Sequence, residues 1–152
     1  MRLTAFTDFG LRTLMYLTSI PAEQLSSVPE VAKVYSASQN HFVKVIGQLT
    51  KLGYVQSIRG KKGGIRLAKH ADDINIGKVI RELENHLDAV NCVKPACQLD
   101  GCCELKHALA QAMEAFLTTM DQYTLSDIVK NKPQLIPLWQ TTETQKNTSL
   151  SD

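Results

Sequence analysis

The stretch SVPEVAKVYSASQNHFVKVIGQLTKLGYVQSIRGKKGGIRLAK, residues 27–69, decides the fold of this chain. It opens with Ser27, Pro29 and Glu30, which is the pattern of a capping box with a proline in the first turn. This pattern predicts a short helix that runs through Tyr35. The stretch therefore begins with a helix whose start is defined by its own side chains.

A second helix is expected after a tight connection. Ser38 should cap this helix, which covers residues 39–52 and stops at Gly53. Its apolar side chains fall on one side, where they would face a core: Phe42, Val45, Ile46 and Leu49. Two short helices joined in this way are typical of a helix-turn-helix.

A basic hairpin follows the helix-turn-helix. Residues 54–58 and 64–68 have strand character, and the sequence RGKKGG, residues 59–64, is a glycine-rich turn. A helix-turn-helix followed by such a hairpin is a winged helix. We therefore predict a mainly α fold, a winged helix-turn-helix with a two-stranded wing.

Further helices are expected on both sides of this stretch. The first should start at Thr7 or Asp8. A later one should be capped by Asn75 or Asp73 and end near His86. Together with the wing, these helices would form a DNA-binding domain of residues 1–86.

A long helix is predicted from Glu104. Apolar residues recur along it at steps of four or three: Leu105, Leu109, Ala112, Phe116, Met120 and Tyr123. Such a narrow seam is typical of helices that pair with a partner, so we expect a dimerisation helix and a homodimer. Residues 104–138 would hold this helix and a short C-terminal one. The polar tail, 139–152, is expected to lack ordered structure.

Charge is divided unevenly along the chain. Residues 1–69 hold ten Lys and Arg against three acids, a balance of +7, and the remainder holds seven against twelve, a balance of −5. A basic half beside an acidic half favours a polyanionic partner at one end, and with the winged helix this indicates double-stranded DNA.

Candidate DNA contacts lie on the second helix of the motif and on the wing. Gln39 and Asn40 can bond adenine, while Lys44 can contact guanine or phosphate. Arg59 would enter a narrow A·T minor groove at the wing tip. The complete predicted set is Ser38, Gln39, Asn40, His41, Lys44, Arg59, Lys61 and Lys62. Lys61 and Lys62 are expected to touch phosphates only.

Other classes of protein lack support in the sequence. There is no Ser/His/Asp grouping, phosphate loop or paired-carboxylate pocket, so we do not expect an enzyme. No apolar run approaches the roughly 20 residues that span a bilayer, and the start MRLTAFTDFG lacks the features of a secretory signal. No membrane association is expected and the predicted location is cytoplasmic. In that compartment clustered cysteines indicate metal or redox chemistry.

All four cysteines fall in the loop predicted for residues 87–103, within the segment NCVKPACQLDGCCELKH: Cys92, Cys97, Cys102 and Cys103. Zinc sites usually show closer pairs such as C-x2-C. The wider gaps here suit an iron–sulfur cluster, either 2Fe–2S or 4Fe–4S, because both accept the same ligands. The rival interpretations are a structural zinc site and a thiol–disulfide switch without metal.

The positions of the cysteines in the chain narrow the set of candidate metal ligands. Neighbouring side chains point apart, so Cys102 and Cys103 are not expected to bind together. Cys103 stands at a helix start, where the helix dipole favours its thiolate. We therefore predict Cys92, Cys97 and Cys103 as ligands, with no role assigned to Cys102. One helical turn later, His107 is the local candidate for a fourth ligand.

These segments together resemble a known family. LTAFTDFGLRTLMYL, SQNHFVKVIGQLTKLGYV, RGKKGGIRLAK, INIGKVIRELE and the C-x4-C-x5-C loop are similar to the NsrR branch of the iron–sulfur winged-helix repressors, which also include IscR. The resemblance runs from residue 1 to about residue 130. The IscR-like branch has a wider first cysteine gap and a histidine ligand where this chain has Lys106, so the nitric-oxide-sensing NsrR branch fits better.

The resemblance implies a homodimer in which three cysteines and an aspartate of the partner subunit hold the cluster. That aspartate matches Asp8, and Arg12 one turn later would orient its carboxylate. The implied function is a repressor that binds an A·T-rich palindromic operator and releases it when nitric oxide attacks the cluster. The alternative is a thiol-redox or cluster-status regulator without nitric-oxide specificity.

Overall fold

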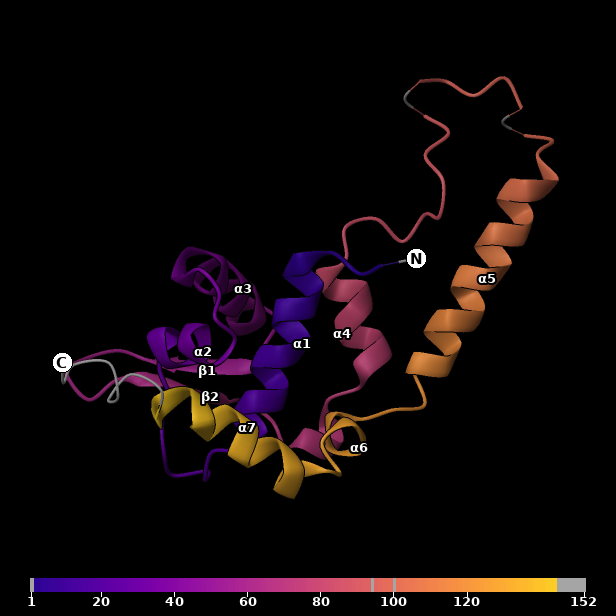
Figure 1. Ribbon diagram of the computed structural model, residues 1–152. Coiled ribbons are helices and arrows are strands. Elements are labelled where there is room, and N and C mark those ends of the chain that lie inside the picture. Colours follow the sequence, from indigo (N-terminus) through magenta and orange to yellow (C-terminus); the bar gives the residue numbers. More distant parts are fainter. Residues whose placement is uncertain (1, 94, 100, 145–152) are drawn as a thin grey trace, which may run out of the picture.

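The computed structural model describes residues 2–93, 95–99 and 101–144. In chain order, its elements are α1 (Ala5–Thr18), α2 (Val28–Val34), α3 (Gln39–Lys51), β1 (Val55–Ile58), β2 (Gly64–Leu67), the 3-10 turn η1 (Ala71–Asp73), α4 (Ile76–Leu83), α5 (Glu104–Met120), α6 (Leu125–Ile128) and α7 (Lys132–Thr144). The predicted mainly α, winged-helix fold is confirmed (Figure 1).

The helix-turn-helix consists of α2 and α3. The capping box at the start of α2 is confirmed: the Glu30 amide donates to the Ser27 hydroxyl, and the Glu30 carboxylate accepts from the Ser27 amide at 2.9 Å. Ser38 is the residue before α3, but its side chain makes no capping hydrogen bond. The start of α3 therefore keeps amide groups that no side-chain cap covers.

The wing is an antiparallel pair. Its register runs from Val55 opposite Leu67 to Ile58 opposite Gly64. Gly60 in the turn has a φ of +111°, a conformation that side chains with a Cβ rarely adopt. Two further backbone hydrogen bonds, of 3.0 and 2.8 Å, join Ser26 to Ile65 and fix the wing to the segment before α2.

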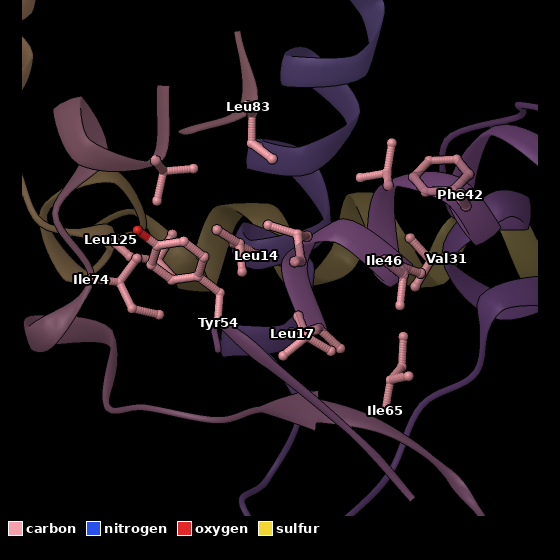
Figure 2. Packing of buried hydrophobic residues seen from close by; sticks show 14 of the residues in the cluster. Leu14, Leu17, Val31, Phe42, Ile46, Tyr54, Ile65, Ile74, Leu83 and Leu125 are labelled. Carbon is pink, nitrogen blue, oxygen red and sulfur yellow. The ribbon is translucent and has the colours of Figure 1, made fainter. Parts of the chain in front are cut away.

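The core lies where α1, α3, α4 and the wing meet. Figure 2 shows Leu14 and Leu17 of α1 beside Ile46 of α3 and Ile65 of β2. These side chains are at most 4% exposed. Removal of this apolar surface from water is the main force that holds the helix-turn-helix and the wing together as one unit.

Two helix boundaries differ from those predicted. α1 begins at Ala5, earlier than expected, because Thr4 acts as its cap. α4 is capped by Asn75, as one alternative had it, but it ends at Leu83 and not near residue 86. The cause is Glu84, whose extended backbone leaves the helix while its side chain binds the start of α1.

The N-terminal part of α5 stands away from the other helices in Figure 1, whereas its C-terminal part packs against α4. The cysteine-bearing segment joins α4 to α5. Only Leu117 on α5 is buried, and Leu105 is 64% exposed. The helix ends at Met120, so the predicted seam loses Tyr123, which lies in the following turn.

The C-terminal segment was predicted wrongly in part. α7 continues to Thr144, past residue 139, where a disordered tail was expected to begin. It packs against α2, and Trp139 lies edge-on to Tyr16 with ring centres 5.8 Å apart. Pro137 lacks the amide N–H of one helical hydrogen bond within α7, while the aromatic contact acts in the opposite direction by holding the helix against α1. Residues 145–152 of the predicted tail lie outside the described residues. None of the described helices combines the length and apolar character needed to cross a membrane.

Candidate nucleic-acid interface and metal site

The outer face of α3 carries the predicted base contacts. Ser38, Gln39, Asn40, His41 and Lys44 are all exposed. The opposite face packs into the core, with the apolar residues predicted for it buried: Phe42, Val45, Ile46 and Leu49. The helix thus presents a polar surface on a rigid base, which is what reading base edges requires.

The tip of the wing carries the other three predicted contacts. Arg59, Lys61 and Lys62 are exposed in the turn between β1 and β2, and the hairpin projects from the helical body (Figure 1). The chain has no acidic residue between Glu30 and Asp72. Helix α3 and the wing therefore form a surface without negative side chains of their own, suited to a phosphate backbone.

The cysteine loop joins α4 to α5. None of the four cysteines is in a disulfide; Cys92 and Cys103 are half-buried, and Cys97 and Cys102 are exposed. The amide of Cys97 donates to the carbonyl of Cys92 at 3.1 Å, so one turn brings these two backbones together. Cys103 precedes the first residue of α5, as predicted.

The loop does not gather its thiols into a completed site. Among residues 2–93, 95–99 and 101–144, no three His, Cys, Asp or Glu side chains come close enough to hold a metal ion. A groove of about 820 Å³ lies between the start of the loop and α5, and Cys92 and Met113 are among its lining residues. His107 is exposed on α5, and its amide donates to the Cys103 carbonyl at 3.3 Å.

Asp8 lies on α1, and its side chain is 44% exposed. Its carboxylate accepts a hydrogen bond of 2.8 Å from Nε of Arg12, the pairing that the sequence had suggested. Within the described part of one chain, Asp8 does not join the thiols as a metal-binding group. Its carboxylate is partly open to solvent and is held by a single arginine.

Arg12 connects this carboxylate to the helix-turn-helix, a link the sequence did not reveal. The hydroxyl of Tyr35, at the end of α2, donates to the Arg12 carbonyl at 2.9 Å, and the Arg12 guanidinium lies 5.8 Å from the centre of the Tyr35 ring. Burial raises the pKa of Tyr35 to about 12, although the nearby Arg12 charge acts in the opposite direction. Tyr35 is therefore a neutral donor at physiological pH, so this contact stays intact.

A second unforeseen link joins α1 to α4. The Glu84 carboxylate accepts from the Thr4 amide at 3.0 Å, from the Thr4 hydroxyl at 3.1 Å and from the Thr7 hydroxyl at 2.8 Å. Burial would raise the pKa of Glu84, but these hydrogen bonds together outweigh it and hold the pKa below its ordinary value. No local sequence pattern pairs residues this far apart.

Comparison with known proteins settles the family. Residues 3–131 match the Rrf2 family, described as iron-dependent transcriptional regulators. The chain belongs to the Rrf2 family. This Rrf2 chain is similar to IscR of T. potens, with 25% identity, a TM-score of 0.68, and coverage of 87% of this chain and 88% of IscR.

CymR, the global cysteine regulator of B. subtilis, shares the fold at 24% identity, with a TM-score of 0.70 and coverage of 86% of this chain and 98% of CymR. CymR of Staphylococcus aureus matches at 23% identity and a TM-score of 0.67, covering 82% and 95% of the two chains. The Rrf2 chain is thus a DNA-binding transcriptional regulator, and its relatives are regulators rather than enzymes. Helix α7 lies beyond the residues that match the family.

Proposed function

We propose that this Rrf2-family regulator is an iron–sulfur repressor that binds a palindromic operator as a homodimer and releases it in response to nitric oxide. The observation that carries the proposal is the cysteine loop. All cysteines of the chain lie on this one loop, which joins the DNA-binding helices to α5, and none of them is in a disulfide.

The donor set suits an iron–sulfur cluster. Cys92, Cys97 and Cys103 offer thiols that are at least partly accessible, and the glycine at position 101, with a φ of +98°, gives the loop a bend between the second and third of them. These three thiols and Asp8 of the partner subunit would hold the cluster. Binding requires the loop to draw its thiols together, since they are apart in the described chain. A bound cluster of the 2Fe–2S or 4Fe–4S type supplies iron to which nitric oxide binds.

The chain's own side chains can carry the signal from Asp8 to the DNA. Asp8 is paired with Arg12, and Arg12 contacts Tyr35 at the end of α2, next to the start of α3. Holding the carboxylate at the partner's loop would fix α1 relative to that loop and so fix the separation of the two α3 helices. A freed carboxylate would return to Arg12 alone. A coupling of about 1–3 kcal/mol between the two sites changes DNA affinity roughly 5- to 150-fold.

Exposed apolar surface on one chain supports the homodimer. Most of α5 is exposed, including Leu105. Where α5 meets α1, an apolar groove of about 280 Å³ is lined by Leu11, Met15, Phe116 and Met120, among others. Covering this surface with a second copy would remove it from water and would place two α3 helices for half-sites about 34 Å apart.

A thiol-redox regulator without metal is the second candidate. Cys102 and Cys103 are adjacent free thiols, and Cys102 is exposed. CymR of Staphylococcus aureus, which shares the fold, has been solved in an oxidized form. In this version the same loop would respond to oxidants through reversible disulfides, and the chain would carry no iron.

Anaerobic purification separates the two candidates. The proposal expects coloured protein that contains iron and acid-labile sulfide in equal amounts, and whose binding to its operator weakens on addition of nitric oxide. Colourless protein without iron, whose mass and thiol count change reversibly with oxidant, would favour the thiol switch. Operator binding that ignores both signals would contradict both candidates.

A further inference from the structure

The outer face of α3 includes one apolar side chain among polar ones. Val43 is 57% exposed. It lies one turn after Asn40 and one turn before Gly47, beside Lys44, so these four positions share one side of the helix. The predicted DNA contacts at this surface are all polar, and none of them accounts for a valine.

Packing within the chain does not require an apolar side chain at Val43. The core side of α3 is already filled by Phe42, Val45, Ile46 and Leu49, which are at most 4% exposed. A β-branched residue on a solvent-facing helix surface neither favours the helix nor gains from burial in the free chain. Its apolar surface would contribute to binding when a ligand of the chain covers it.

The neighbouring glycine indicates that this ligand comes close to the helix. A Cβ atom placed on Gly47 would meet nothing within 4 Å, so packing inside the chain does not require glycine there. Glycine weakens an exposed helix relative to alanine. Its lack of a side chain leaves a low area next to Val43, through which a groove wall or backbone can approach.

We propose that Val43 reads the 5-methyl group of thymine in the major groove, and so sets operator specificity together with Asn40. The inference rests on the proposed use of α3 to bind the operator. Thymine is the only base that presents a methyl group in the major groove, and apolar side chains contact it there. Asn40 has the amide that pairs with adenine, so neighbouring positions of one helix face would recognise the two partners of A·T pairs. Because the chain has no acidic residue between Glu30 and Asp72, the charge of this surface favours DNA as the ligand that covers Val43.

The test replaces each thymine of the operator half-site in turn by uracil, which removes only the methyl group. The operator is selected from random duplexes with the parent protein, purified anaerobically and kept free of nitric oxide. When uracil replaces one particular thymine in a single half-site, parent binding should weaken about fourfold, the effect of losing one buried methyl group. Val43→Ala alters both subunits, so it should weaken binding to the thymine duplex about as much as uracil at that position in both half-sites weakens parent binding. The variant should no longer distinguish thymine from uracil at that position.

A matched control separates this contact from general weakening. Lys61→Ala, on the wing, should lower affinity for both duplexes while keeping the full thymine preference. The inference fails if the parent ignores uracil at every position, or if Val43→Ala retains the parent's discrimination. Either failure leaves the proposed response to nitric oxide unaffected, because every titration is completed without that signal. If the parent selects no operator at all, the proposed function itself fails.

Discussion

The hydroxyl of Thr7 on α1 donates a hydrogen bond of 2.8 Å to the buried carboxylate of Glu84, the residue that ends α4. Asp8 follows Thr7 directly, and the cysteine loop begins a few residues after Glu84. One buried contact therefore ties the proposed ligand on α1 to the root of the loop in the same chain.

Glu84→Gln should lower the free energy of unfolding by about 1–3 kcal/mol at neutral pH, because a buried hydrogen-bonded carboxylate is replaced by a group with an unmatched donor. Since the pKa of Glu84 in the folded protein lies below its ordinary value of 4.5, its contribution is present above that pH and is lost as the pH falls through the folded-state value. Urea unfolding at several pH values measures this. Thr7→Val, which removes one donor of three, should cost less; an equal stability of parent and Glu84→Gln at neutral pH would contradict the prediction.

The wing lysines should contribute charge rather than specificity. Lys61→Ala and Lys62→Ala are each expected to reduce the slope of log affinity against log salt by about 1 per subunit, with no change in operator preference. Lys130→Ala is the control, since that exposed lysine lies outside the wing and pairs with Asp127 on α6. Fluorescence anisotropy at several salt concentrations gives the slopes. A wing variant that changes operator preference but keeps the parent's slope would assign these lysines to base recognition.

Three of the four cysteines are expected to be metal ligands, and the fourth, Cys102, is not. Cys92→Ala, Cys97→Ala and Cys103→Ala are expected to lose iron and sulfide on anaerobic purification, whereas Cys102→Ala should retain both. The reason is that Cys103 stands at the start of α5, while the thiol of Cys102 donates to the Leu99 carbonyl at 3.6 Å. Iron retained in Cys103→Ala but lost in Cys102→Ala would exchange the two assignments.

Helix α7 should stabilise the DNA-binding domain although it lies outside the residues that match the family. Trp139→Ala is expected to cost about 1–2 kcal/mol, from the lost ring contact with Tyr16 and the apolar area around it. Leu138→Ala is the neighbouring control: this side chain is 68% exposed and its loss should change stability by less than about 0.5 kcal/mol. Thermal unfolding compares them. Equal melting temperatures for the parent and Trp139→Ala would mean that α7 does not contribute in solution.

The parts of the fold that local patterns govern were predictable. The capping box at Ser27, the alternation of buried and exposed residues in α3, and the glycine-rich turn of the wing are short-range features, and the structure confirms them. Helix ends failed where a distant side chain decides them: Glu84 ends α4 through its bonds to α1. In the same way, α7 depends on Tyr16, whose contact with Trp139 no local pattern in the C-terminal segment reveals.

In the candidate site, too, some features were predictable from the local sequence and others depend on distant residues. Exposure of the predicted DNA contacts followed from helix periodicity and the wing turn. The link from Asp8 through Arg12 to Tyr35 joins two helices, so only the Asp8–Arg12 step, one helical turn apart, was visible in the sequence. In the proposed site the cysteines would come together on the metal and Asp8 would come from a second chain, so neither the sequence nor a single chain determines that geometry.

The most direct test of the central claim is an anaerobic operator titration of the parent and Asp8→Ala, before and after nitric oxide. The account predicts that both proteins contain iron and sulfide, that nitric oxide weakens parent binding at least several-fold, and that it changes Asp8→Ala binding little. An Asp8→Ala protein that keeps its iron and releases the operator on nitric oxide as fully as the parent does would contradict the account.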